Sequence, residues 1–203
     1  RARRPHGQAR LPACTGEDRV KLSRFMDDAY QHKVRNRKLE TRRGDLVLGL
    51  EDLADKVGDR PTRAEVEKLA PIDVTLLQRL VSQKPKGKRN SAIWGILTAI
   101  AADRSAVPFR LEAGDYAGAE LSRGTLILEQ GGDHVGEKMS GGKIMVLKGC
   151  GDYLGQEMTG GGILAQSCRD YAFRNMRGGW GVVRGDAGNY AGLGNQLGKI
   201  LIR

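Results

Sequence analysis

The stretch GDHVGEKMSGGKIMVLKGC occupies residues 132–150, and GDYLGQEMTGGGILAQSC follows it at residues 151–168. Both read as one pattern: a Gly-Asp pair, an aromatic ring, a methionine, a glycine pair and a short run of β-forming residues. The pattern recurs, with changes, from residue 114 to residue 203. Self-similarity at a fixed period predicts stacked units, none of which can bury its apolar face alone.

Five repeats start at residues 114, 132, 151, 169 and 188, so neighbouring starts lie 18 or 19 residues apart. An aromatic ring follows the Asp or Asn of each repeat: Tyr116, His134, Tyr153, Tyr171 and Tyr190. A glycine lies nine residues past the same Asp or Asn: Gly124, Gly142, Gly161, Gly179 and Gly198. These structural glycines predict chain corners, where φ is often positive and backbones approach closely.

A run of β-forming residues follows each of these glycines, at residues 125–128, 143–146, 162–165, 180–183 and 199–202. Side chains alternate along a strand, so Leu126 and Leu128 face one way while Thr125 and Ile127 face the other. Equivalent residues of stacked coils lie about 4.8 Å apart. We therefore predict a parallel β-helix in which one row fills the axis and the other faces outward. Leu121 and the methionines at the same repeat position, residues 139, 158 and 176, are expected to join the inner row.

The repeat resembles the GXGXG domain, which closes the large subunit of glutamate synthase and recurs in one subunit of formylmethanofuran dehydrogenase. The nearest matches are MSGG at residues 139–142 and MTGG at residues 158–161, within a resemblance that covers residues 109–203. It implies a right-handed β-helix that holds catalytic domains together and carries no catalytic residue. The amidotransferase domain, flavin barrel and iron–sulfur ligands of those enzymes have no counterpart in this sequence.

The chain has two compositionally distinct parts. Residues 1–104 carry 23 Lys and Arg against 14 Asp and Glu, whereas residues 105–203 carry 11 against 10 and hold 22 of the 29 glycines. We predict an α+β chain with an extended or disordered basic arm at 1–16, a basic α-helical region at 17–104 and a β-solenoid of about five coils at 105–203. The positive charge favours an anionic partner such as RNA or an acidic protein, although a solubilising surface explains it equally well.

Apolar spacing and capping residues predict five helices within residues 17–104. The first is expected where Leu22 to Tyr30 form an apolar face, and the second at residues 45–57, closed by Gly58. The third begins at a capping box formed by Thr62 and Glu65, and the fourth follows an Asp73 cap. The fifth covers residues 92–102 and is capped by Ser91 or Asn90. The last helix is apolar and contains Trp94. We expect it to cover the end of the solenoid, because an open first coil would expose core and strand edge.

Two basic runs in the helical region are candidate nucleic-acid contacts, because lysine and arginine bind backbone phosphates. Their residues are Lys33, Arg35, Arg37, Lys38, Arg42 and Arg43 in the first run, and Lys84, Lys86, Lys88 and Arg89 in the second. Solvated surface charge explains both runs as well. The region matches no helical motif for DNA or RNA binding.

The sequence predicts no catalytic, cofactor-binding or metal-binding residue. The glycines near residue 192 precede a strand, whereas phosphate loops open a helix. His6, His32 and His134 are too dispersed to suggest a metal site, and His134 is expected to stack as a surface ring. The Asp or Asn of each repeat is expected to bond to corner backbone rather than to share a cation.

Three further positions interrupt or decorate the repeat. Cys150 and Cys168 are expected to be small residues under a corner, although a stack of thiols could bridge on oxidation. With Cys14 they make an odd count and no metal spacing, which favours a reducing compartment. Phe173 replaces a repeat glycine, and we interpret this as drift of an exposed corner; a local distortion or a docking point is the alternative.

The expected function is that of a non-catalytic scaffold subunit of a larger intracellular assembly. Its expected partners are other protein subunits and, through the basic helices, RNA; no cofactor is expected. The Arg-rich, acid-poor start resembles an organellar presequence, although a chain beginning part-way through a longer sequence would look the same. This favours a mitochondrial ribonucleoprotein such as the mitochondrial ribosome, located in the matrix, with the cytoplasm as the alternative.

The rival interpretation is an accessory subunit of a glutamate synthase-like or formylmethanofuran dehydrogenase-like complex, with catalysis on other chains. A small-molecule enzyme is disfavoured because no nucleophile, base or cofactor loop stands out. The longest apolar run, around residues 92–102, is too short to span a bilayer.

Overall fold

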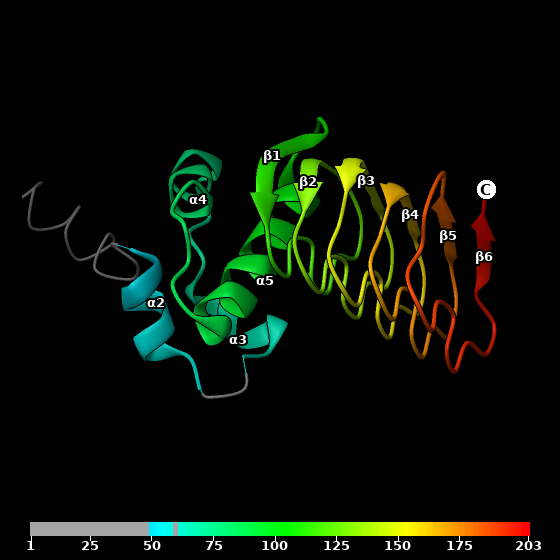
Figure 1. Cartoon of the computed structure of the whole chain (residues 1–203). Helices are drawn as coiled ribbons and strands as arrows, with labels where there is room; N and C mark the ends of the chain where they lie inside the picture. Colours follow the sequence, from blue (N-terminus) through cyan, green and yellow to red (C-terminus); the bar gives the residue numbers. More distant parts are fainter. Residues whose placement is uncertain (1–48, 59–60) are drawn as a thin grey trace, which may run out of the picture. The chain divides into compact units, whose positions relative to one another are not determined.

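The computed structural model describes residues 49–58 and 61–203, which contain a small helical region followed by a parallel β-solenoid of about five turns (Figure 1). This confirms the predicted fold class. The chain divides into two units, and all the described residues belong to the second, Leu46–Arg203. The predicted basic arm and the helix expected at residues 22–30 lie outside the described residues. The domain boundaries predicted near residues 16 and 104 stay predictions.

Among the described residues, four helices precede the solenoid: α2 (Leu50–Lys56), α3 (Arg63–Leu69), α4 (Val74–Val81) and α5 (Lys88–Arg104). The predicted capping box opens α3, where the Thr62 hydroxyl accepts from the Glu65 amide and the Glu65 carboxylate accepts from the Thr62 amide, both at 3.4 Å. The Asp73 carboxylate caps α4 by accepting from the Thr75 amide at 2.7 Å. Both predicted caps are confirmed.

Helix α5 starts earlier than predicted. Its N-cap is Gly87, at φ 82°, rather than Ser91 or Asn90. The Ser91 hydroxyl donates to the Gly87 carbonyl at 3.1 Å and so lies inside the first turn. The glycine explains the difference, because only glycine adopts a positive φ at low cost and the helix can begin directly after it.

Helix α5 lies between the other helices and the first coil, and residues 91–102 are almost entirely buried. Trp94 joins the two sides: its indole Nε1 donates to the Val81 carbonyl at 2.8 Å, and its ring fills the space over Gly114 of the solenoid. The prediction that this helix covers the solenoid end is confirmed. The apolar end of the coil stack is thereby removed from water.

The solenoid carries one parallel sheet whose strands follow chain order: β1 (Phe109–Gly114), β2 (Thr125–Gly131), β3 (Lys143–Gly149), β4 (Gly162–Ser167), β5 (Trp180–Val183) and β6 (Lys199–Ile202). Each strand pairs with its counterpart in the next coil, as in Leu126 opposite Ile144. Five strands match the predicted runs. Strand β1 was not predicted, because no repeat glycine precedes it.

The alternation of inner and outer rows is confirmed. Leu126, Leu128 and Ile144 are fully buried, and Leu121 and the three repeat methionines are also fully buried. In β6 the inward position Ile202 is 45% exposed, because no described residue lies over the last coil. The axis of the preceding coils is therefore filled mainly with aliphatic and thioether side chains.

The interpretation of Phe173 as drift at an exposed corner is wrong. Phe173 is fully buried, and its ring points into the axis against Gly155 and Gly181. Gly181 takes the β5 position that Ile163 and Ile200 fill in the neighbouring strands. A bulky residue at the corner is therefore accommodated by the loss of a side chain on the strand, and the volume of the core is kept.

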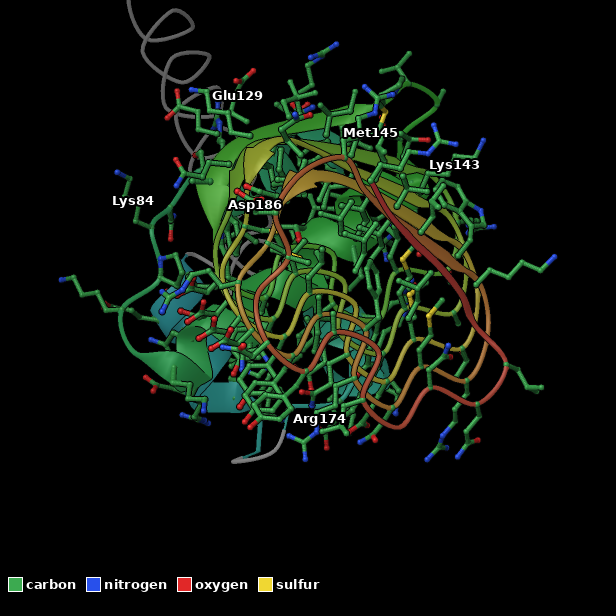
Figure 2. The ribbon with its side chains drawn as sticks, turned by 45° about the vertical axis from the view of Figure 1, so that its right-hand side comes forward. Lys84, Glu129, Lys143, Met145, Arg174 and Asp186 are labelled. Atoms are coloured by element: carbon green, nitrogen blue, oxygen red, sulfur yellow. The ribbon has the colours of Figure 1, made fainter. Side chains whose placement is uncertain are left out.

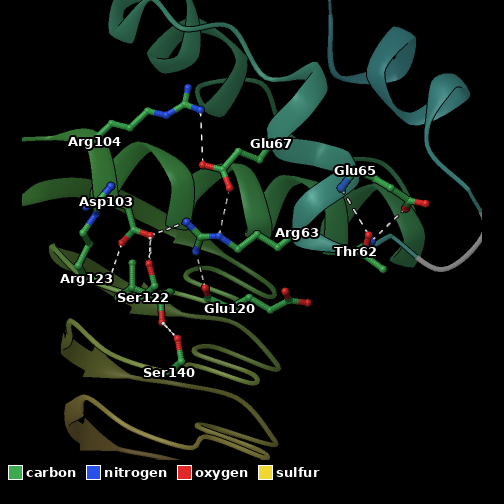
Figure 3. Close-up of polar contacts among 11 residues, drawn as sticks. Thr62, Arg63, Glu65, Glu67, Asp103, Arg104, Glu120, Ser122, Arg123 and Ser140 are labelled. Carbon is green, nitrogen blue, oxygen red and sulfur yellow. Dashed lines mark hydrogen bonds and ion pairs between the residues drawn. The ribbon is translucent and has the colours of Figure 1, made fainter.

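A polar junction attaches the helices to the first coil (Figure 3). The Asp103 carboxylate, 2% exposed, accepts from Arg63 at 2.6 Å, from the Ser122 hydroxyl at 2.7 Å and from the Arg123 amide at 2.8 Å. Arg63 also donates to the Glu120 carbonyl. One buried carboxylate thus connects the end of α5, the start of α3 and a loop of the solenoid.

Replacing Asp103 with alanine should destabilise the protein by about 2–3 kcal/mol. Breaking a fully buried pair costs roughly 3–5 kcal/mol, and the Arg63 side chain is 20% exposed, which lowers the penalty. Urea unfolding measures the loss. Glu67→Ala is the control, because Glu67 is 47% exposed and lies 3.7 Å from its arginine partners; its expected cost is about 0–1 kcal/mol. Equal losses in the two variants would contradict the assignment.

Gly142→Ala should also destabilise the protein. Gly142 has φ 69°, and an added Cβ would lie 2.6 Å from the Arg123 carbonyl oxygen of the coil before it. The left-handed backbone alone costs about 1–2 kcal/mol, and the overlap with backbone adds to it. Gly58→Ala is the matched control, since nothing lies within 4 Å of its added Cβ. Thermal unfolding of both variants should show a large loss only at Gly142.

Candidate interaction surfaces

The second basic run lies on the surface between α4 and the start of α5. Lys84, Lys86, Lys88 and Arg89 are all exposed. Arg89 already has a structural contact, because its guanidinium donates to the Ala54 and Val57 carbonyls at 2.8 and 2.6 Å and so closes the end of α2. The three lysines stay candidate phosphate contacts. The first basic run, Lys33 to Arg43, lies outside the described residues.

The Asp and Asn row bonds to backbone, as predicted. One oxygen of Asp115 accepts from the Asp133 amide at 3.0 Å, and Asp133 accepts from the Asp152 amide at 2.9 Å. The same contact repeats from Asp152 to the Asp170 amide and from Asp170 to the Asn189 amide. Each carboxylate therefore satisfies an amide of the next coil and helps to hold the coils in register.

An aromatic ladder runs along the next corner position. Its five rings are Tyr116, His134, Tyr153, Tyr171 and Tyr190, with successive centroids 4.5, 4.8, 5.1 and 5.0 Å apart and planes within 14° of parallel. All five residues have φ close to 60°. The predicted stacking of His134 is confirmed. The corner conformation repeats in each coil, so every ring is placed over the one before it.

Two charged side chains, Glu137 and Arg174, contact rings of the ladder. A carboxylate oxygen of Glu137 lies 2.9 Å from His134 Nδ1, and the guanidinium carbon of Arg174 lies 5.7 Å from the centroid of the Tyr171 ring. Burial raises the pKa of the Tyr116 phenol, and the nearby carboxylates of Glu137, Asp115 and Asp133 raise it further. The Tyr116 phenol is therefore a neutral donor at physiological pH.

The outer face of the sheet carries a continuous apolar row. Ile127, Met145, Leu164, Val182 and Leu201 are directly opposite one another from β2 to β6. We call these five residues the outer row. Leu147 and Trp180 lie on the same face and are 44% and 40% exposed. Figure 2 shows Met145 and Lys143 on this face and Arg174 on the opposite side of the solenoid.

The two described cysteines are buried under a corner, as predicted. Cys150 is 6% exposed and its thiol donates to the Ser167 carbonyl at 3.3 Å, while Cys168 is 7% exposed and pairs with Ala187 in an isolated bridge. Burial raises the pKa of Cys150 to about 12, with a smaller contribution from Cys168. Burial raises the pKa of Cys168 to about 11. Both are free thiols and stay protonated at neutral pH.

A cavity of about 520 Å³ lies where α5 meets the corner of the first two coils. The helical side contributes Pro61, Lys88, Arg89, Ala92 and Ile96, and the solenoid contributes Tyr116, Ala119, Glu120, Glu137 and Lys138. The sequence did not predict it. Its walls come from four separated segments, and no local pattern brings them together. The predicted structural glycines, in contrast, lie at corners, and four of the five have positive φ.

The described residues contain no group of three or more His, Cys, Asp or Glu side chains able to hold a metal ion. Within residues 49–58 and 61–203, no helix combines the length and apolar character that a bilayer crossing requires. Comparisons of the chain with protein-family models, with curated proteins and with solved structures find no match. The resemblance to the GXGXG domain therefore depends on the repeat pattern alone.

The buried thiols should resist alkylation. At pH 8 in a Cys14→Ser background, we expect Cys150 and Cys168 to react with iodoacetamide at least about a hundred-fold more slowly in the folded protein than after unfolding. A thiol with its pKa two to three units above the ordinary value has about a hundredth to a thousandth of the thiolate. Mass spectrometry of quenched samples gives both rates. Similar rates in the folded and unfolded states would contradict the buried placement.

Proposed function

We propose that this chain is a non-catalytic scaffold subunit that holds other proteins of a larger assembly through the outer row of its sheet. The observation that carries this proposal is the outer row itself, five aligned apolar side chains on a regular parallel sheet with Leu147 and Trp180 beside them. Leu201 is 42% exposed and the other four residues of the row are half-buried. Contiguous apolar surface that reaches solvent marks a site of protein association.

The regularity of the sheet favours a rigid spacer. Coils held by strand pairing, the carboxylate row and the aromatic ladder give side chains at a fixed spacing along the solenoid. A partner surface with matching apolar side chains can bind such a row without reorganising it. Lys143 and Lys199 lie on the same face, each at the start of its strand, and add a polar, positively charged rim.

The assembly that we propose is an organellar ribonucleoprotein of the mitochondrial matrix, such as the mitochondrial ribosome. The net positive charge and the Arg-rich, acid-poor composition of residues 1–16 support it, as do the exposed lysines Lys84, Lys86 and Lys88. In this proposal protein subunits bind the outer row and RNA phosphates bind the lysines of the helical region.

The alternative is an accessory subunit of a glutamate synthase-like or formylmethanofuran dehydrogenase-like oxidoreductase. It is favoured by the likeness of the Met-x-Gly-Gly corners to those of the GXGXG domain. In this chain Gly142 and Gly161 both have positive φ and lie tightly against the preceding coil, so these glycines have a structural role in the repeat. Catalysis would then belong to other chains, and the solenoid would hold them together.

A double variant, Met145→Glu with Leu164→Glu, should abolish co-purification of partner subunits with the tagged chain. The two carboxylates would be desolvated without partners in the interface. Both side chains face outward, so the melting temperature should stay within a few degrees of wild type. Native affinity purification followed by mass spectrometry is the measurement. If the purified complex contains RNA that is released as the salt concentration rises, the ribonucleoprotein proposal is supported. If it contains flavin, molybdenum or tungsten and no nucleic acid, the accessory-subunit alternative is supported.

Gln166→Glu is the matched control. It adds a negative charge on the outer face of β4, at the next outward position after Leu164, where the side chain is already exposed and polar. It should keep all partners. Unchanged partner recovery with the double variant, or substrate turnover by the isolated chain, would refute the scaffold proposal.

A further inference from the structure

The aromatic ladder ends at Tyr116 in the first coil. Tyr116 stacks on His134 with centroids 4.5 Å apart and planes 1° from parallel, so one face of its ring is covered. No aromatic ring continues the ladder beyond Tyr116 in the described part of the chain. Instead Gly95 of α5 packs against the backbone and Cβ of Tyr116, and Tyr116 lines the cavity together with Ala92 and Ile96 of α5.

The cavity has the size and lining of a small-molecule site. Its volume of about 520 Å³ lies within the roughly 300–1,000 Å³ of ligand pockets. Ala92, Ile96 and Ala119 give it an apolar wall, and Ile96 and Ala119 are buried. A flat ring inserted between this wall and Tyr116 would extend the ladder by one step, and such stacking is tolerant of ring chemistry.

Two charged groups at the cavity have no partner in the described structure. The Lys88 ammonium makes no ion pair or hydrogen bond among residues 49–58 and 61–203, and neither does the Glu120 carboxylate, whose backbone carbonyl alone is bound by Arg63. Figure 3 shows the Glu120 side chain extending away from the Asp103 junction. The other charges are engaged: Arg89 with α2, and Glu137 with His134 and Lys138.

An aromatic platform, an unpaired carboxylate and an unpaired ammonium select a ligand with three matching features. A planar ring stacks on Tyr116, a ring amine donates to Glu120, and an anionic group binds Lys88. An amino-substituted nucleobase carrying a phosphate has all three, because its exocyclic amine donates to a carboxylate and its phosphate takes a lysine as a point charge.

We propose that the cavity between α5 and the first coil binds a nucleotide whose base carries an exocyclic amine, with the base stacked on Tyr116 as the next ring of the ladder and the phosphate beside Lys88. The same chemistry is presented by a free mononucleotide and by the terminal nucleotide of an RNA strand. The site is separate from the outer row, and its test does not depend on the scaffold proposal.

Calorimetric titration of the full chain with AMP tests the site. AMP should bind with 1:1 stoichiometry, and more tightly than adenosine, which lacks the contact with Lys88, or inorganic phosphate, which lacks both contacts of the base. IMP, which has a carbonyl in place of the amine, should bind about tenfold more weakly, since Glu120 then faces an acceptor. A 5′-phosphorylated adenylate oligomer is then tested as a competitor. If it displaces AMP, the ligand is the end of an RNA strand; if it does not, the ligand is the free nucleotide.

Variants separate the site from non-specific binding. Tyr116→Ala should weaken AMP binding at least about fivefold by loss of stacking, while Tyr116→Phe keeps it. Tyr190→Ala, at the other end of the same ladder, is the control and should leave binding unchanged. Lys88→Ala, at an exposed position where misfolding is not expected, should reduce AMP affinity to that of adenosine. No saturable AMP binding, or equal losses in Tyr116→Ala and Tyr190→Ala, overturns the proposal.

Discussion

Every coil has to bring the chain back to a point one strand spacing, about 4.8 Å, from where the previous coil passed. A chain that completes each turn in 18 or 19 residues and closes on this spacing has little freedom at its corners. Three features follow from this one constraint: the glycine at Gly142 and its equivalents, the left-handed backbone at Tyr116 and its equivalents, and the carboxylate that accepts a hydrogen bond from an amide of the next coil. The filled axis and the ladders are its consequences rather than separate designs.

Repetition made most of the solenoid predictable from sequence. A β-forming run would be a weak signal in one coil, but such a run follows a glycine at the same offset in five coils, and these five runs are observed as β2 to β6. The caps at Thr62 and Asp73 were predictable because they depend on two residues close in sequence. Strand β1 was missed because no repeat glycine precedes it. The start of α5 was missed because its N-cap is a glycine, Gly87, and not one of the polar residues Ser91 or Asn90.

Contacts between segments that share no local pattern could not be predicted from the sequence. Asp103 meets Arg63 and Ser122 only because α5 ends beside the first coil, and the cavity needs α5, a residue just before α3 and two corners at once. Phe173 was misread for the same reason. Its effect depends on Gly181, eight residues later in the chain but adjacent in the core. The outer row, in contrast, follows directly from the period of two in each strand.

The exchange between Phe173 and Gly181 makes the fourth coil unlike the others. Coils of nearly equal length and composition could in principle stack out of order, with a strand pairing one level too high or too low. Phe173 and Gly181 lie in the same coil, eight residues apart, so such a shift would carry both to the new level together. What the pair fixes is the volume at its own level. A large residue at the corner and a missing side chain on the strand fill the axis as Gly155 and Ile163 do one coil earlier, so a repeat can vary in sequence without changing the cross-section of the stack.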